Sequence, residues 1–211
     1  MKKTLISIVA ILFISSAFLL IDDPKPTIAI GETAPMPDLK MKDVSGKELS
    51  INDIKDKNGA LVIFSCNTCP FVIGNSKSEG WEGRYNEMAE LARSAEVGIV
   101  FINSNEAKRD KGDSYEDMVQ RAKAKSFTMP YVIDNNHVMA DAFGAKTTPH
   151  VFLFNNELKL VYKGAIDDNN ESSARVKEHW LENALDQLSK NEKVDPATTR
   201  NIGCSIKRIK S

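Results

Sequence analysis

The chain has 211 residues, of which 27% are charged and 42% hydrophobic, and its formal net charge is −1. This length suits one well-buried domain with short appendages rather than two domains. The near-neutral charge gives no compositional support for a nucleic-acid-binding protein.

The first residues have the pattern of an export segment. Lys2 and Lys3 precede an apolar run, residues 5–21, that contains no charged side chain. This predicts a secretory signal peptide or an N-terminal membrane anchor over residues 1–21, because the run is close to the shortest apolar stretch that spans a bilayer, roughly 17 residues. We therefore expect the protein in the periplasm or cell envelope, and both a cleaved signal and an outward-facing anchor remain open.

Short apolar runs predict one mixed sheet. The runs at 60–64, 97–102 and 129–133 have the pattern of strands that are buried on both faces. Two further runs, 151–154 and 158–163, flank a polar turn and predict a β-hairpin. Helical segments join the first three strands, which should therefore be parallel, and the hairpin should add antiparallel strands at one edge.

The helical segments complete a predicted α/β fold with helices on both faces of the sheet. Ser114 and Asp117 form a capping-box pattern that predicts a helix through Lys125. Gly144 should end a short helix over 138–143, and apolar residues at spacings of three and four predict a final helix over 176–188. The helix expected after residue 69 contains several glycines and should be interrupted in its first half.

Cys66 and Cys69 directly follow the first buried strand. We expect Cys66 near the start of the next helix, where unpaired N–H groups and the helix dipole stabilise a thiolate, and Cys69 one turn away to resolve a mixed disulfide. The sequence thus predicts a two-cysteine redox site. Cys204 is the odd thiol, and a third redox thiol, an intermolecular link and an inert group are its three interpretations.

Several motifs together resemble the thioredoxin-like superfamily, in its redoxin (AhpC/TSA, peroxiredoxin-like) branch. These are Cys66-Asn-Thr-Cys69, Thr148-Pro149, the leader Gly31–Pro35, the turn Asp43–Gly46, the segment Ile102–Asn105, the Phe143–Pro149 stretch and the Gly203–Lys207 tail. The resemblance implies a three-layer thioredoxin-like domain over 31–190, preceded by a leader at 22–30 and followed by a C-terminal tail at 191–211. It also implies that Pro149 is a cis-proline facing the cysteines, and that the backbone of Thr148 pairs with an extended substrate segment.

Two departures from the family pattern bear on activity. Thioredoxins carry an acidic residue six positions before the first cysteine, where this chain has Ala60, so the proton acceptor is unassigned. Peroxiredoxins carry a proline and a threonine ahead of their peroxidatic cysteine. If that cysteine is aligned with Cys69, Val62 and Cys66 stand at those positions.

The expected function is therefore a thiol–disulfide oxidoreductase of the cell envelope with no cofactor. Its substrates would be protein thiols and disulfides or a small thiol or peroxide, with a redox partner protein. A thiol peroxidase is the alternative.

Two other classes are weaker interpretations. Cys66, Cys69, Cys204 and His150 offer a Cys3His zinc set or a copper site, although His150 is expected to face solvent. A non-catalytic binding module would use Phe71, Trp81 and Tyr85 to line a groove, although their helical spacing favours the core.

Overall fold

A seven-stranded mixed sheet forms the centre of the molecule in a computed structural model, which describes residues 26–209. The strands are Met41–Asp43 (β1), Glu48–Leu49 (β2), Gly59–Ser65 (β3), Val97–Asn103 (β4), Tyr131–Ile133 (β5), His150–Asn155 (β7) and Leu160–Gly164 (β8). Their order is β2-β1-β5-β4-β3-β7-β8. The strands β3, β4 and β5 are parallel, and β7 and β8 continue the sheet as an antiparallel hairpin at one edge, as predicted.

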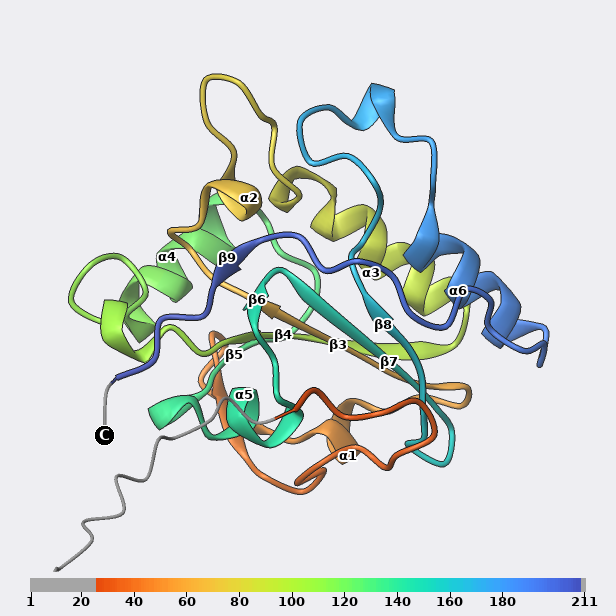
Figure 1. Ribbon diagram of the computed structural model, residues 1–211. Helices are drawn as coiled ribbons and strands as arrows, with labels where there is room; N and C mark the ends of the chain where they lie inside the picture. Colours follow the sequence, from red (N-terminus) through yellow and green to blue (C-terminus); the bar gives the residue numbers. More distant parts are fainter. Residues whose placement is uncertain (1–25, 210–211) are drawn as a thin grey trace, which may run out of the picture.

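Helices cover both faces of this sheet, so the expected three layers are present (Figure 1). The α-helices are Ile51–Ile54 (α1), Pro70–Ile73 (α2), Tyr85–Ser94 (α3), Tyr115–Ala124 (α4), Val138–Phe143 (α5) and Trp180–Ser189 (α6). Short 3-10 turns lie at Glu82–Arg84, Glu106–Lys108, Asn135–His137 and Ser173–Arg175. One core cluster contains buried residues of α3, α4 and α6, and the other contains those of α1 and α5.

The fully buried strand β3 joins the two layers. Leu61 and Ile63 belong to the core beneath α3 and α6, whereas Val62 and Phe64 belong to the core beneath α1 and α5. Successive side chains of a strand point to opposite faces, so a strand covered on both sides has to be apolar throughout. This central position fixes the carboxyl end of β3, where the cysteines follow.

Most predicted elements are confirmed. The capping box of Ser114 and Asp117 opens α4, and Gly144 ends α5 in the left-handed conformation. The last helix begins at Trp180 rather than at residue 176, because the chain before it forms a 3-10 turn and an extended residue at Val176. The hairpin of β1 and β2, the short helix α1 and a two-residue strand in the C-terminal tail were not predicted.

The segment after α6 runs back across the molecule to the carboxyl ends of the central strands (dark blue in Figure 1). There Cys204–Ser205 (β9) pairs with Thr147–Thr148 (β6) in a separate two-stranded sheet. The described part of the tail is therefore held in place by backbone hydrogen bonds to β6.

The predicted export segment, residues 1–21, lies outside the described residues. Within residues 26–209, no helix combines the length and apolar character that crossing a membrane requires.

Candidate redox site

The two cysteines lie at the junction of β3 and α2, but not in the predicted positions on the helix. Cys69, rather than Cys66, is the N-cap residue of α2, and Pro70 is its first helical residue. Proline is favoured there because the first turn of a helix leaves its N–H groups unpaired. The helix ends after one turn at Gly74, which has a φ of 79°, so the predicted interruption is confirmed. Cys66, expected near the helix start, precedes the N-cap residue by three positions.

Both sulfur atoms meet the residue that precedes the cis-proline. The Thr148–Pro149 peptide bond is cis, as the resemblance implied. The Sγ of Cys66 lies 3.2 Å from the Thr148 hydroxyl, and the Sγ of Cys69 lies 3.3 Å from the Thr148 carbonyl oxygen. Residues far apart in the sequence thus bring two thiols and one extended backbone segment together. The three cysteines are free thiols.

Cys69 is the more acidic of the two thiols. A hydrogen bond from the Cys66 thiol lowers the pKa of Cys69 to about 5 against the effect of burial, with further donation from Cys204 and Thr148. Burial raises the pKa of Cys66 well above its ordinary value. The N–H of Cys69 donates to Cys66 Sγ at 3.2 Å and favours a charge there, but we expect burial to outweigh this one bond because Cys66 is only 1% exposed.

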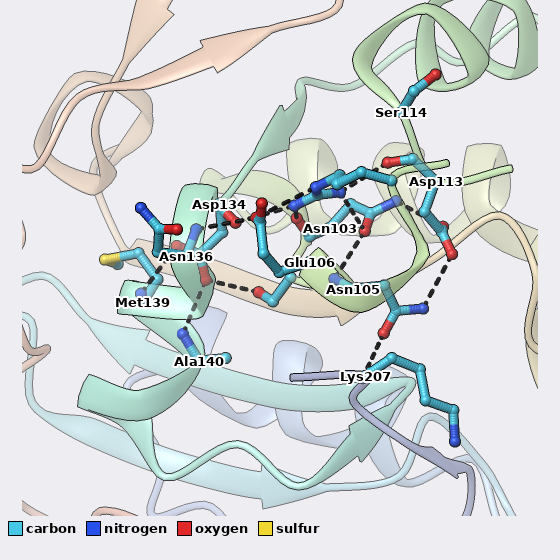
Figure 2. A network of polar contacts seen from close by, with 12 residues as sticks. Asn103, Asn105, Glu106, Asp113, Ser114, Asp134, Asn136, Met139, Ala140 and Lys207 are labelled. Carbon is cyan, nitrogen blue, oxygen red and sulfur yellow. Dashed lines mark hydrogen bonds and ion pairs between the residues drawn. The ribbon is translucent and has the colours of Figure 1, made fainter. Parts of the chain in front are cut away.

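A buried carboxylate that the sequence analysis missed holds the two residues between the cysteines. Asp113 accepts hydrogen bonds from the Asn67 N–H and the Thr68 hydroxyl, both at 2.7 Å. It also accepts from the side-chain amides of Asn103 at 2.8 Å and Asn105 at 3.1 Å (Figure 2). The fully buried Asp113 therefore fixes the conformation of the cysteine motif from the loop that follows β4.

The sequence contained a signal for part of this network. Asn103 and Asn105 follow a buried strand, and adjacent parallel strands end at the same edge of a sheet, so polar side chains there lie near the cysteines. Asp113 lies in a charged loop with no local pattern that separates it from the exposed Asp110. This chain has Ala60 where thioredoxins carry an acidic residue, and a carboxylate from another segment, Asp113, contacts the cysteine motif.

Cys204 joins the same site through β9. It is paired with Thr148, whose carbonyl oxygen lies 3.3 Å from Cys69 Sγ, and hydrogen bonding with Cys204 contributes to the lowered pKa of Cys69. The tail continues past the site, where the Lys207 N–H donates to the Asn105 side-chain oxygen at 2.9 Å (Figure 2). The fold therefore brings Cys204 next to Cys66 and Cys69, the cysteines of the predicted redox site.

His150 is buried, contrary to the prediction that it faces solvent. It is 4% exposed, and its Nδ1 accepts the Lys146 N–H at 3.2 Å. The reason is that β7 lies inside the sheet between β3 and β8, with both faces covered. Within the described chain, no cluster of three or more His, Cys, Asp or Glu side chains has the arrangement of a metal site.

The aromatic residues of the binding-module interpretation lie mostly in the core. Trp81 and Tyr85 are 0% and 1% exposed, and Phe71 is partly buried against the same cluster. They do not form an open groove, and the Tyr85 hydroxyl is bonded to Ser65 at 2.8 Å.

Comparison with known structures supports this fold. An uncharacterized conserved protein from Geobacillus kaustophilus is 31% identical, with a TM-score of 0.77 over 87% of this chain and 94% of the other. A hypothetical protein from Sinorhizobium meliloti is 29% identical, with a TM-score of 0.77 over 88% and 98% of the two chains.

A more distant structure has the same fold. It is a Chlorobium tepidum protein provisionally described as a thiol:disulfide interchange protein, 14% identical, with a TM-score of 0.54 over 78% and 98% of the two chains. A comparison with curated proteins gave no match. The redoxin family model matches residues 31–183. The chain therefore belongs to the redoxin family, whose fold is thioredoxin-like.

Proposed function

We propose that this protein is a thiol–disulfide oxidoreductase that works through Cys66 and Cys69. The observation that carries the proposal is the meeting of both sulfur atoms at Thr148, within 3.3 Å of its backbone and side-chain oxygens. Two thiols held this close together can reduce a substrate disulfide by exchange and then form a disulfide with each other. The Thr148 backbone edge itself is paired with β9, so the proposal rests on the two sulfur atoms and not on a substrate strand added at that edge. Membership of the redoxin family supports the same class of chemistry.

The acidity of the thiols supports an order of steps that differs from the sequence expectation. The Cys69 thiolate attacks a substrate disulfide, forms a mixed disulfide and releases one substrate thiolate. Cys66 then loses its proton and attacks the Cys69 sulfur, which forms the Cys66–Cys69 disulfide and releases the second substrate thiolate. The protein is oxidised by two electrons, the substrate is reduced by two, and a dithiol partner returns the protein to its starting state.

Reduction of insulin or glutathione disulfide by the purified full chain tests this function. We expect turnover in the presence of a dithiol reductant, its loss to background in Cys69→Ser, and a Cys66–Cys69 disulfide in the oxidised wild type. The control Ser205→Ala changes an exposed hydroxyl near the site and should retain turnover. Absence of turnover in the wild type, or turnover that survives Cys69→Ser, would exclude the proposal.

The pH dependence provides a second check on the roles. A Cys69 pKa of about 5 means that its thiolate is present above about pH 5 and is lost as pH falls below it. Ultraviolet thiolate absorbance should therefore appear with a midpoint near 5 in the wild type, and this transition should be missing in Cys69→Ser. A single transition near the ordinary cysteine value of about 8.5 would contradict the assignment.

Thiol peroxidase activity is the second candidate, and one observation favours it. Cys69 is an acidic thiol whose lowered pKa is due in part to hydrogen bonds from Cys66 and Thr148, and a peroxidatic cysteine needs such a thiolate. Against it, Val62 and Cys66 stand at the positions where the peroxiredoxin pattern has its proline and threonine when its peroxidatic cysteine is aligned with Cys69. Consumption of hydrogen peroxide that outpaces disulfide reduction under the same reductant would favour the peroxidase.

We place this activity in the cell envelope on the basis of the basic start and the apolar run at residues 5–21. The substrates there would be protein thiols and disulfides, and a membrane-anchored form would keep the site outside the cytoplasm. Cell fractionation combined with the mass of the mature protein distinguishes a cleaved signal, a retained anchor and a chain that is not exported.

A further inference from the structure

The C-terminal strand is fixed against the redox site at several points. Next to the two cysteines of the motif, β9 pairs with β6 so that Cys204 lies opposite Thr148. Beyond it, the Ile206 N–H donates to the Lys146 carbonyl at 3.0 Å, and Arg208 donates to the Ala145 carbonyl at 2.7 Å. These contacts hold Cys204 at one position relative to the cysteine motif.

The backbone packing on one side of Cys204 requires a residue without a side chain. A Cβ on Gly203 would lie 2.4 Å from the Thr148 carbonyl oxygen and 2.8 Å from the Thr148 carbonyl carbon. Real side chains do not approach backbone atoms this closely, so any larger residue would push the strand away. The tail reaches this distance only because residue 203 is glycine.

Cys204 and Cys69 both lie against Thr148. Cys204 is opposite Thr148 in the β6–β9 pair, and Cys69 Sγ lies 3.3 Å from the Thr148 carbonyl oxygen. Hydrogen bonding with Cys204 is also one of the causes that lower the pKa of Cys69. Cys204 is also the most accessible of the three thiols, since it is half-buried while Cys66 and Cys69 are 1% and 4% exposed. A disulfide that moved from the buried pair to Cys204 would therefore move toward solvent.

We propose that Cys204 is the third thiol of a three-cysteine relay, which takes over the disulfide from Cys66 and presents it to a reductant. This deepens the proposed function and rests on it. The Cys204 thiolate attacks the Cys69 sulfur of the Cys66–Cys69 disulfide, which forms a Cys69–Cys204 disulfide and releases the Cys66 thiolate to be protonated. No electrons enter or leave in this step. A dithiol reductant then reduces the Cys69–Cys204 disulfide and is itself oxidised to a disulfide.

The electrostatics of the site favour this order. In the reduced protein, burial and the neighbouring Cys69 raise the pKa of Cys204 to about 11. When Cys69 enters a disulfide it loses its negative charge, so its contribution disappears. The Phe71 N–H and the Lys207 charge, which favour a thiolate at Cys204, remain. Cys204 is thus held protonated until Cys66 and Cys69 form their disulfide.

A glutathione-disulfide experiment in a Cys66→Ser background tests the relay. Glutathione disulfide should form a mixed disulfide with Cys69, and Cys204 should displace the glutathione. We expect a Cys69–Cys204 peptide after non-reducing digestion and little glutathione adduct. In Cys66→Ser/Cys204→Ser the adduct should persist and the crosslinked peptide should be lost.

The placement of the thiol is tested separately from its presence. Cys66→Ser/Gly203→Ala keeps all the chemistry but displaces the strand, and we expect the glutathione adduct to persist. The matched control is Cys66→Ser/Gly83→Ala, because a Cβ at Gly83 meets no atom within 4 Å. If circular dichroism shows that the Gly203 variant does not fold, the comparison of Cys66→Ser with Cys66→Ser/Cys204→Ser alone tests the relay.

The outcomes distinguish the two proposals. A stable glutathione adduct in Cys66→Ser, with Cys204 unmodified, overturns the relay. If wild-type protein still reduces glutathione disulfide in that case, the two-cysteine function stands without Cys204. If glutathione disulfide and insulin both leave the wild type unoxidised, the proposed function itself has failed.

Discussion

At Cys66 and Cys69, burial and hydrogen bonding act in opposite directions on two thiols of one motif. Cys66 is enclosed at the end of β3, where loss of solvent disfavours its charged form. Cys69 lies at the helix start and receives donors from Cys66 and Cys204. Which of the two thiols is the more acidic is thus decided by a few donor groups, and some of these groups come from segments distant in the sequence.

Asp113 is the residue whose removal should affect the motif most directly. Asp113→Asn replaces a carboxylate that accepts four hydrogen bonds with an amide whose N–H2 group faces donors. We expect a loss of about 3 kcal/mol in the free energy of unfolding, because hydrogen bonds to buried charged groups are the costly ones to break. Urea denaturation measures it.

The same variant should make Cys66 more acidic, because the Asp113 charge contributes to its raised pKa. Thiolate absorbance in a Cys69→Ser/Cys204→Ser background isolates Cys66. Asp110→Asn is the matched control, since that side chain is 75% exposed in the same loop and should leave both quantities unchanged. Equal effects of the two variants would show that Asp113 has no special role.

At this scale the sequence was enough to predict the residues of the candidate site but not the residues that surround them. Cys66, Cys69, Thr148 and Pro149 belong to short motifs with a fixed spacing, so a linear pattern was enough to find them. Asp113 is assigned to the site only by tertiary packing. His150 was misplaced because a single residue of a strand does not reveal whether its neighbours cover both faces.

Among the elements, the loop after β8 is fixed to the start of α3 by a buried ion pair. Asp167 accepts from the Trp81 indole N–H at 2.9 Å and pairs with Arg84 at 2.5 Å. The Arg84 side chain is 13% exposed and that of Asp167 is 8% exposed. Arg84 also donates to the Asn169 carbonyl at 2.8 Å, so a single cluster holds the loop on the helical layer.

Breaking this cluster should cost far more than breaking a surface pair. Asp167→Ala leaves the Arg84 charge and the Trp81 N–H without their acceptor, and we expect a loss of roughly 3 kcal/mol in the free energy of unfolding. Glu171→Ala, which removes a pair with Arg175 whose side chains are about 60% exposed, should cost about 0.5 kcal/mol or less. Denaturant titration compares them, and similar losses would refute the argument.

Element positions were predictable where a local pattern fixes them. The capping box at Ser114 and the glycine after α5 set their helix ends through contacts within a few residues. The start of α6 was placed too early because Val176 continues the apolar spacing but belongs to an extended segment. The tail lacked any strand pattern, since β9 has only two residues and depends on pairing with β6.

For the molecule as a whole, His150 connects the sheet to the redox site. Its ring centre lies 4.4 Å from that of Phe152, and its Nδ1 accepts a hydrogen bond from the loop that carries Thr148 and Pro149. Burial lowers the pKa of His150 to about 3, with smaller contributions from the positive charges of Lys163 and Lys146. Native His150 is therefore neutral over most of the acidic range.

This neutrality makes the global stability pH-dependent. The unfolded chain binds a proton at His150 below about pH 6.5, while the native protein does not bind it until about pH 3. Stability from this group is therefore complete above pH 6.5 and falls by about 1.4 kcal/mol per pH unit as the pH decreases between these values.

His150→Asn retains an acceptor for the Lys146 N–H but has no basic group, so its unfolding free energy should fall less steeply over the same range. His179→Asn, at a side chain that is 55% exposed, should follow the wild type. Urea denaturation between about pH 7 and 4 gives the three slopes. Because carboxylates titrate alike in all three proteins, only a change at position 150 separates the curves. Identical slopes for the His150 variant and the wild type would contradict the prediction, because they would mean that the buried ring takes up its proton before the chain unfolds.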